Sequence, residues 1–159
     1  MKLLETHMKK STLSFLFFIV AICFSSFLFA QGKKPTLNHI AVYVVDLKTS
    51  SDFYSNIIQL DTIPEPFHDN RHTWYRVGPL SHLHVISGAK EKVAHDKNAH
   101  LCFTVESVQD FIPRLEKAKI PYEDWPGNKG KVTTRVDGVK QIYFQDPDGY
   151  WIEINDAKD

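Results

Sequence analysis

The chain has 159 residues and carries 19 basic and 19 acidic side chains, so its formal net charge is zero. Beyond the first residues no basic stripe or block is present, which argues against a nucleic-acid partner. The length fits one domain, and loss of Cys23 with a leader would leave only Cys102, without a disulfide partner. Such a small domain relies on its core, a bound metal or a partner subunit.

The N-terminal residues have the pattern of a secretory signal peptide. Lys9 and Lys10 precede an apolar run over residues 13–30, and the polar Gln31 follows. Leu28 departs from this pattern, because a small residue is expected two positions before the cleavage site. An uncleaved membrane anchor therefore stays open as the alternative, although the run is close to the shortest that spans a bilayer.

We expect a signal peptide over residues 1–30, a linker over residues 31–36 and a folded domain over residues 37–156. This organisation predicts an exported protein, periplasmic or secreted, with no stable membrane insertion once the signal is removed. An exported location argues against substrates that stay in the cytoplasm, such as coenzyme A thioesters.

The domain is predicted to repeat one order of elements twice: strand, helix and three strands. The first half contains a strand over residues 37–45, a helix around 51–58, and strands over about 61–67, 72–77 and 82–87. The second half contains a strand over 99–105, a helix from about 107 to 119, a short strand or edge over 121–125, and strands over 139–145 and 150–155. Pro113 lies either within the second helix or after its first turn. The last two strands are joined by the turn Asp146-Pro147-Asp148-Gly149.

Alternation along the strands separates two faces, since residues two apart in a strand share a face. One face is apolar and is expected to pack against the helices: Ile40, Val42, Val44, Leu83, Val85, Leu101, Phe103, Val105, Ile152 and Ile154. The other face is mixed in size and rich in metal ligands: His39, Ala41, Tyr43, His82, His84, Ile86, His100, Cys102, Thr104, Trp151, Glu153 and Asn155. We therefore predict an α+β fold in which two tandem βαβββ modules form a cup-shaped mixed sheet with helices on its outer face.

Four residues occupy matched positions on the polar face. His39 and His100 open the first strand of each half, while His84 and Glu153 lie at the centre of the last strand of each half. Imidazole nitrogen and carboxylate oxygen suit Zn, Ni, Fe, Mn or Co. The pattern predicts one divalent metal ion held by these four residues. His82 shares the face of His84 one pleat away and is the rival for its role.

The remaining polar residues carry weaker signals. A lone histidine is more often structural than a ligand, and we interpret His68, His72 and His95 in that way. Arg76 is the best candidate for an anionic substrate group, because its planar fork suits carboxylates, although a solvated strand arginine is the alternative. Other candidates to line the cup are Tyr43, Trp74, Gln141 and Tyr143.

The whole domain, residues 37–155, resembles the vicinal oxygen chelate superfamily. The resemblance rests on the motifs Leu37-Asn38-His39-Ile40-Ala41-Val42, Asp52-Phe53-Tyr54, Trp74-Tyr75-Arg76-Val77-Gly78, His100-Leu101-Cys102-Phe103-Thr104-Val105 and Tyr143-Phe144-Gln145-Asp146-Pro147-Asp148-Gly149-Tyr150-Trp151-Ile152-Glu153. It implies two βαβββ modules around one divalent metal, with ligands at the positions of His39, His84, His100 and Glu153. Glyoxalase I usually has Glu at the position of His84 and the epimerases have Gln, so the enzyme class stays open.

The resemblance implies a metal-dependent lyase or isomerase of the glyoxalase type that acts on a small molecule with adjacent oxygens. Glu153 would then leave the metal and move a proton as general base. Two alternatives stay open: an Fe(II) extradiol-type dioxygenase that uses His39, His100 and Glu153, and a non-catalytic protein that sequesters a small ligand. Related single-domain proteins pair modules between subunits, so we expect a homodimer in which the partner also covers exposed strand edges.

Overall fold

The computed structural model describes residues 34–158. The signal peptide predicted over residues 1–30 lies outside these residues. The chain divides after residue 36, and every helix and strand belongs to the unit that begins at Leu37. Within residues 34–158 no helix has the length and apolar character needed to cross a membrane.

The first module forms a four-stranded sheet with one helical segment. Its elements are β1 (His39–Val44), α2 (Leu47–Phe53), one turn of π-helix η1 (Tyr54–Ile58), β2 (Thr62–Ile63), β3 (His72–Arg76) and β4 (His82–Ser87). The strand order is β1-β4-β3-β2, in which β1 and β4 are parallel and the other pairs are antiparallel. The first and last strands of the module are therefore neighbours.

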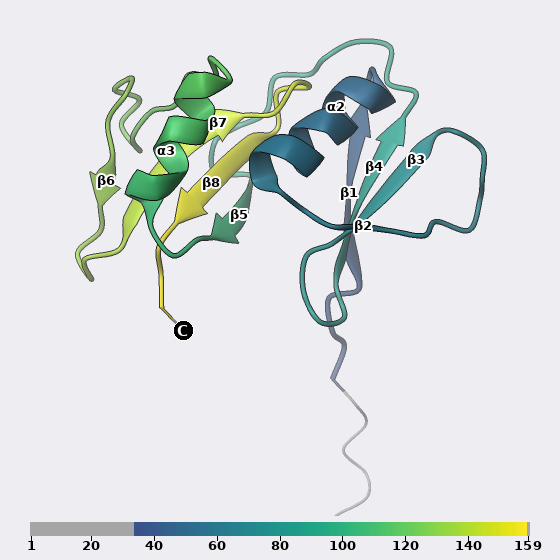
Figure 1. The fold of residues 1–159 in the computed structure, drawn as a ribbon, viewed down its shortest axis with the longest axis horizontal. Helices are drawn as coiled ribbons and strands as arrows, with labels where there is room; N and C mark the ends of the chain where they lie inside the picture. Colours follow the sequence, from purple (N-terminus) through teal and green to yellow (C-terminus); the bar gives the residue numbers. More distant parts are fainter. Residues whose placement is uncertain (1–33, 159) are drawn as a thin grey trace, which may run out of the picture. The chain divides into compact units, whose positions relative to one another are not determined.

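The second module repeats this topology. Its elements are β5 (His100–Thr104), α3 (Val108–Lys117), β6 (Thr133–Thr134), β7 (Lys140–Gln145) and β8 (Trp151–Asn155). The strand order is β5-β8-β7-β6, with β5 and β8 parallel (Figure 1). The predicted α+β fold of two tandem βαβββ modules is confirmed.

Capping residues determine where both helices begin. The Asp46 side chain accepts a hydrogen bond from the backbone amide of Thr49, so α2 begins at Leu47 and not at residue 51 as predicted. Ser107 caps α3 in the same way through the amide of Asp110. Pro113 lies inside α3, which resolves the alternative left open by the sequence.

Two predicted strands differ from the structure. The strand expected over residues 61–67 is only Thr62–Ile63, because two prolines, which cannot donate to a sheet, follow at positions 64 and 66. Residues 121–125 form no strand, and only Glu123 makes isolated bridges, to Lys129 and Tyr143. The edge strand is instead β6, which pairs with β7 after Gly127 and Gly130 turn the chain with positive φ.

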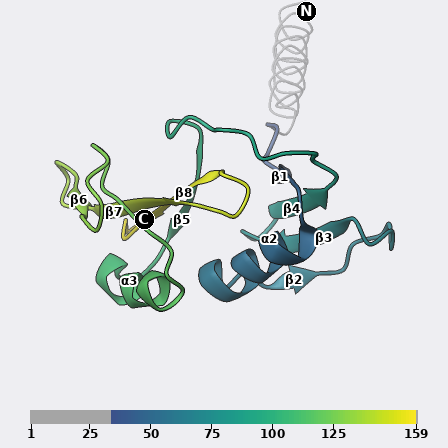
Figure 2. The same ribbon diagram turned by 90° about the horizontal axis from the view of Figure 1, so that it is seen from above.

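The apolar face packs largely as predicted. The fully buried members are Val42, Val44, Leu83, Val85, Ile152 and Ile154. They meet the buried residues of the helical segments, which are Phe53, Tyr54, Val108, Phe111 and Leu115. Figure 2 places α2 beside the strands of the first module and α3 beside those of the second. Ile40 departs from the prediction, since it is 37% exposed at the start of β1.

Two buried carboxylates in the turn between β7 and β8 bind the first module. Asp148 accepts hydrogen bonds from the Val45 amide at 2.7 Å and from the Ser50 hydroxyl at 2.6 Å. Asp146 accepts one from the Tyr54 hydroxyl at 2.8 Å. Burial raises the pKa of Asp146, although the hydrogen bond from Tyr54 acts in the opposite direction. These contacts join the modules through two carboxylates that are almost fully buried.

Replacing Asp148 with alanine should lower the free energy of unfolding by about 3 kcal/mol, because the Ser50 hydroxyl and the Val45 amide would both lose a charged acceptor. Urea denaturation followed by tryptophan fluorescence measures the change. The matched control is Asp137→Ala, an exposed carboxylate that should cost less than about 0.5 kcal/mol. Equal midpoints for the two variants would contradict the structural role of Asp148.

Candidate metal centre

The first half of the candidate site is a stack of three aromatic rings on the polar face of the first sheet. The rings of His39 and His84 lie with centroids 4.3 Å apart and planes 6° apart. Trp74 of β3 lies 3.9 Å from His84, with its ring plane 3° from that of the histidine. His84 is 8% exposed, and its Nε2 atom is buried with no hydrogen-bond partner within residues 34–158. An orphaned imidazole nitrogen is a position that a metal ion could satisfy.

The His84 side chain is uncharged at neutral pH. Burial, followed by the neighbouring charges of His39 and His82, lowers the pKa of His84 to about 4. In a neutral imidazole one nitrogen carries the proton and the other carries a lone pair, so Nε2 of His84 is either a donor or a lone-pair ligand, depending on the tautomer. His39 Nδ1 lies 2.8 Å from the amide oxygen of Asn38. An oxygen in that position accepts a proton from Nδ1, which leaves His39 Nε2 as a lone-pair donor.

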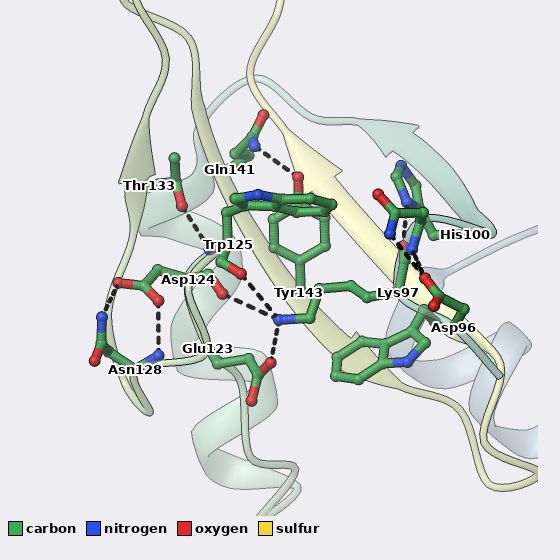
Figure 3. A network of polar contacts seen from close by, with 12 residues as sticks. Asp96, Lys97, His100, Glu123, Asp124, Trp125, Asn128, Thr133, Gln141 and Tyr143 are labelled. Atoms are coloured by element: carbon green, nitrogen blue, oxygen red, sulfur yellow. Dashed lines mark hydrogen bonds and ion pairs between the residues drawn. The ribbon is translucent and has the colours of Figure 1, made fainter. Parts of the chain in front are cut away.

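The second half is a histidine and a carboxylate in direct contact. His100 Nε2 lies 3.2 Å from Glu153 Oε2. The other ring nitrogen, Nδ1, lies 2.7 Å from the backbone oxygen of Lys97, which can only accept, so Nδ1 carries a proton (Figure 3). Two ligand atoms about 2.1 Å from one ion, at 90° to 110°, are roughly 3.0–3.4 Å apart. The His100–Glu153 spacing fits one divalent ion.

Three neighbours hold the Glu153 carboxylate. Tyr143 donates to Oε2 at 2.6 Å. The Tyr143 hydroxyl in turn accepts from Gln141 at 2.6 Å (Figure 3). Asn155 donates to Oε1 at 2.9 Å, and the Cys102 thiol also donates to Oε1, at 3.3 Å. Burial opposes ionisation, but these hydrogen bonds outweigh it and lower the pKa of Glu153. The carboxylate is therefore an anion held in one orientation.

The two pairs occupy equivalent places in their sheets. His39 is in register with His82, and His100 is in register with Trp151. The residue that contacts His39 is His84, two residues beyond His82. The residue that contacts His100 is Glu153, two residues beyond Trp151. Side chains two apart share a face, so each pair is a diagonal on the same face of a parallel ladder. We call the pairs the first half-site (His39 and His84) and the second half-site (His100 and Glu153).

The structure brings together the members of each half-site, but it does not bring together all four residues. Within residues 34–158 they contribute to no group of three or more ligand atoms that lie within 4.8 Å of one another. One ion would require such a group. A single described chain therefore contains two half-sites and not one closed site.

The group that does satisfy this spacing was not predicted. It consists of Glu65, Asp69 and His72, in the loop before β3 and at its first residue. Asp69 Oδ1 accepts from His72 Nδ1 at 2.8 Å, and the two oxygens of Glu65 accept from the amides of Phe67 and His68. These bonds give the cluster a structural explanation within the loop. No periodic pattern links its three residues, so the sequence carried no signal for it.

A cleft of about 550 Å³ opens beside the second half-site, with His100 and Glu153 in its wall. Its other lining residues include Trp125, Arg135, Gln141 and Tyr143. The last two were predicted to line the cup. Trp125 and Arg135 were missed. Trp125 ends the segment predicted as a short strand or edge over residues 121–125, and Arg135 follows β6, outside the predicted strands. Arg76 is exposed on β3, opposite His82.

Comparison with known proteins supports the same fold. Residues 36–154 match the glyoxalase/bleomycin resistance protein/dioxygenase superfamily. The chain is 28% identical over 126 residues to the metallothiol transferase FosB of Staphylococcus epidermidis, covering 76% of this chain and 80% of that protein. It is 26% identical over 125 residues to an Arabidopsis thaliana protein named glyoxylase I 4, covering 75% of this chain and 69% of that protein.

A solved structure, a glyoxalase/dioxygenase from Nostoc punctiforme, has the same fold. It superimposes with a TM-score of 0.65 at 22% identity, over 82% of this chain and 96% of that one. The family match extends from before β1 to within β8, so it includes both modules and all four residues of the half-sites. The chain belongs to the glyoxalase/bleomycin resistance protein/dioxygenase superfamily.

Proposed function

We propose that the protein is a divalent-metal-dependent lyase or isomerase of the glyoxalase type, acting on a small substrate with vicinal oxygens. The observation that carries this proposal is the pair of half-sites in matching register, each with nitrogen or oxygen atoms suited to one ion. His39, His84, His100 and Glu153 would hold Zn, Ni, Fe, Mn or Co. Three neutral imidazoles and one carboxylate leave the ion a net charge near +1, enough to polarise a bound substrate oxygen.

The separation of the half-sites supports a homodimer with shared sites. Each chain offers one first half-site and one second half-site, and a two-fold axis would bring each against the complementary half-site of a second copy. Two complete sites would form in this way, and each copy would contribute two ligands to each site. The cleft beside the second half-site would supply space for a substrate, since small-molecule sites occupy about 300–1,000 Å³.

Glu153 is the residue we assign to proton transfer. Its Oε2 faces His100, while Oε1 is held by Asn155 and Cys102 on the other side. The carboxylate is ionised and is the only one of the four ligands that can take a carbon-bound proton while its orientation is kept by neighbours. Tyr143, which donates to Oε2, would stabilise the charged form between turnovers.

Removal of His84 should abolish stable metal binding, whereas removal of His82 should not. His84 has the orphaned Nε2 atom and contacts His39, while the His82 ring lies 6.2 Å from that of His84. Elemental analysis of purified His84→Ala and His82→Ala proteins measures the metal content per chain. Loss of metal only in His82→Ala would place the ligand one pleat away from our assignment.

Mixing two defective variants tests the shared site. His84→Ala damages only first half-sites and Glu153→Ala only second half-sites, so random pairing should restore about a quarter of all sites. Metal content of the co-refolded mixture is the measurement. A mixture of His84→Ala with His39→Ala is the control and should regain none, because both changes fall in the same half-site. If refolded wild-type protein binds metal but the mixture of His84→Ala and Glu153→Ala does not, sites do not form across two copies.

Glu153→Gln should bind metal but lose about 100- to 10,000-fold of its turnover, the usual contribution of a general base. The assay is exchange of the carbon-bound proton of α-hydroxyketones in D₂O, followed by proton NMR. Glu106→Gln, a carboxylate outside both half-sites, is the control. Unchanged proton exchange by metal-loaded Glu153→Gln protein would remove Glu153 from the chemistry. Bound Fe together with oxygen consumption by the wild-type protein would favour the dioxygenase alternative.

A further inference from the structure

Lys97 is a nearly enclosed cation that belongs to neither half-site. Its side chain is 17% exposed, and its ammonium group pairs with Glu123. The ammonium also lies over three aromatic rings, at 4.8 Å from the centroid of Trp151, 5.5 Å from Tyr143 and 5.9 Å from Trp125 (Figure 3). A lysine is seldom buried unless its charge is compensated, and here one carboxylate and three ring faces compensate it.

The same ammonium ties two segments that are distant in sequence. Besides Glu123, it donates to the backbone oxygens of Asp124 at 3.4 Å and of Trp125 at 3.2 Å. Lys97 itself lies in the turn that leads into β5, where the amide of Ala99 donates to the Asp96 oxygen at 2.9 Å. Its side chain therefore anchors this turn to the loop that follows α3.

Both members of the second half-site depend on groups that touch Lys97. The Lys97 backbone oxygen accepts the proton of His100 Nδ1 at 2.7 Å. The Tyr143 ring lies under the ammonium, and its hydroxyl donates to Glu153 at 2.6 Å. A carbonyl bond to one ring nitrogen selects the tautomer and leaves the other nitrogen for the metal. The side chain of Lys97 thus fixes the position from which its own carbonyl acts.

We propose that Lys97 is a positioning residue for the second half-site. It holds the turn before β5 so that its carbonyl accepts the Nδ1 proton of His100 and keeps Nε2 of that ring 3.2 Å from Glu153. This inference rests on the proposed metal-dependent function, but the hydrogen bond from His100 Nδ1 to the Lys97 carbonyl can be measured in metal-free protein. The two ideas can therefore fail separately.

The test compares three substitutions with the wild-type full-length protein. Lys97→Met keeps the apolar stem among the rings but removes the charge. Glu123→Gln leaves Lys97 in place and weakens its anchor, which covers the case in which the methionine variant does not fold. Lys97→Arg restores a cation of similar reach, and Lys90→Met changes an exposed lysine in the segment between the modules as the matched control.

Two readouts separate positioning from general stability. The ¹H and ¹⁵N resonances of His100 Nδ1–H in metal-free protein report its hydrogen bond to the Lys97 carbonyl, and titration with Co²⁺ followed by visible absorption gives the affinity. We expect Lys97→Met to weaken this hydrogen bond and to bind Co²⁺ about 10- to 100-fold more weakly, the usual effect of losing a residue that orients a ligand. Glu123→Gln should shift both in the same direction by less, Lys97→Arg should recover most of the loss, and Lys90→Met should match the wild type.

Folded Lys97→Met or Glu123→Gln protein with the wild-type His100 hydrogen bond and affinity would overturn the proposal. So would a loss of affinity that Lys97→Arg fails to recover, because this would indicate a packing role with no dependence on the charge. Absence of Co²⁺ binding by the wild-type protein would overturn the proposed function instead. The His100 Nδ1–H resonances of the metal-free variants would then decide the role of Lys97 alone.

Discussion

Parallel pairing between the first and last strand of each module is the constraint on which the site depends. A shift of one residue in either ladder would turn His84 or Glu153 toward the helices and expose the neighbouring apolar residues. Burial of a side chain such as Leu83 or Ile152 contributes about 1.5–3 kcal/mol, so the apolar face holds the register in place. The diagonal contacts of both half-sites are then a consequence of core packing on the opposite face.

The side chains of the two half-sites are held by different interactions. In the first, aromatic stacking and burial keep His84 neutral and leave one nitrogen without a partner. In the second, hydrogen bonds from Tyr143 and Asn155 keep Glu153 ionised in spite of burial. The first half-site thus consists of imidazoles, and the second contains a negative charge. The duplicated fold therefore carries two chemically distinct half-sites.

The repeated fold was predictable because it follows from alternation with a period of two along single strands. The same alternation placed the two residues of each half-site on one face, while metal binding by the four residues stays a prediction. The edge strand β6 was not predicted, since its pairing with β7 depends on how glycines turn a loop of mixed composition. Nothing local indicated that His84 and His100 belong to separate half-sites, because the packing of one module on the other sets their distance. Lys97 was missed for the same reason, as its partners come from a loop and two strands far along the chain.

The hydrogen bond between Cys102 and Glu153 also affects the redox chemistry of the chain. Burial, followed by the charge of Glu153, raises the pKa of the Cys102 thiol to about 12. Only the thiolate attacks disulfides and peroxides, so a raised pKa makes this thiol less reactive than an ordinary cysteine. Cys102 is the single cysteine within residues 34–158, and it is exposed while its sulfur contacts Glu153. The carboxylate of the second half-site thus favours the thiol form of its neighbour.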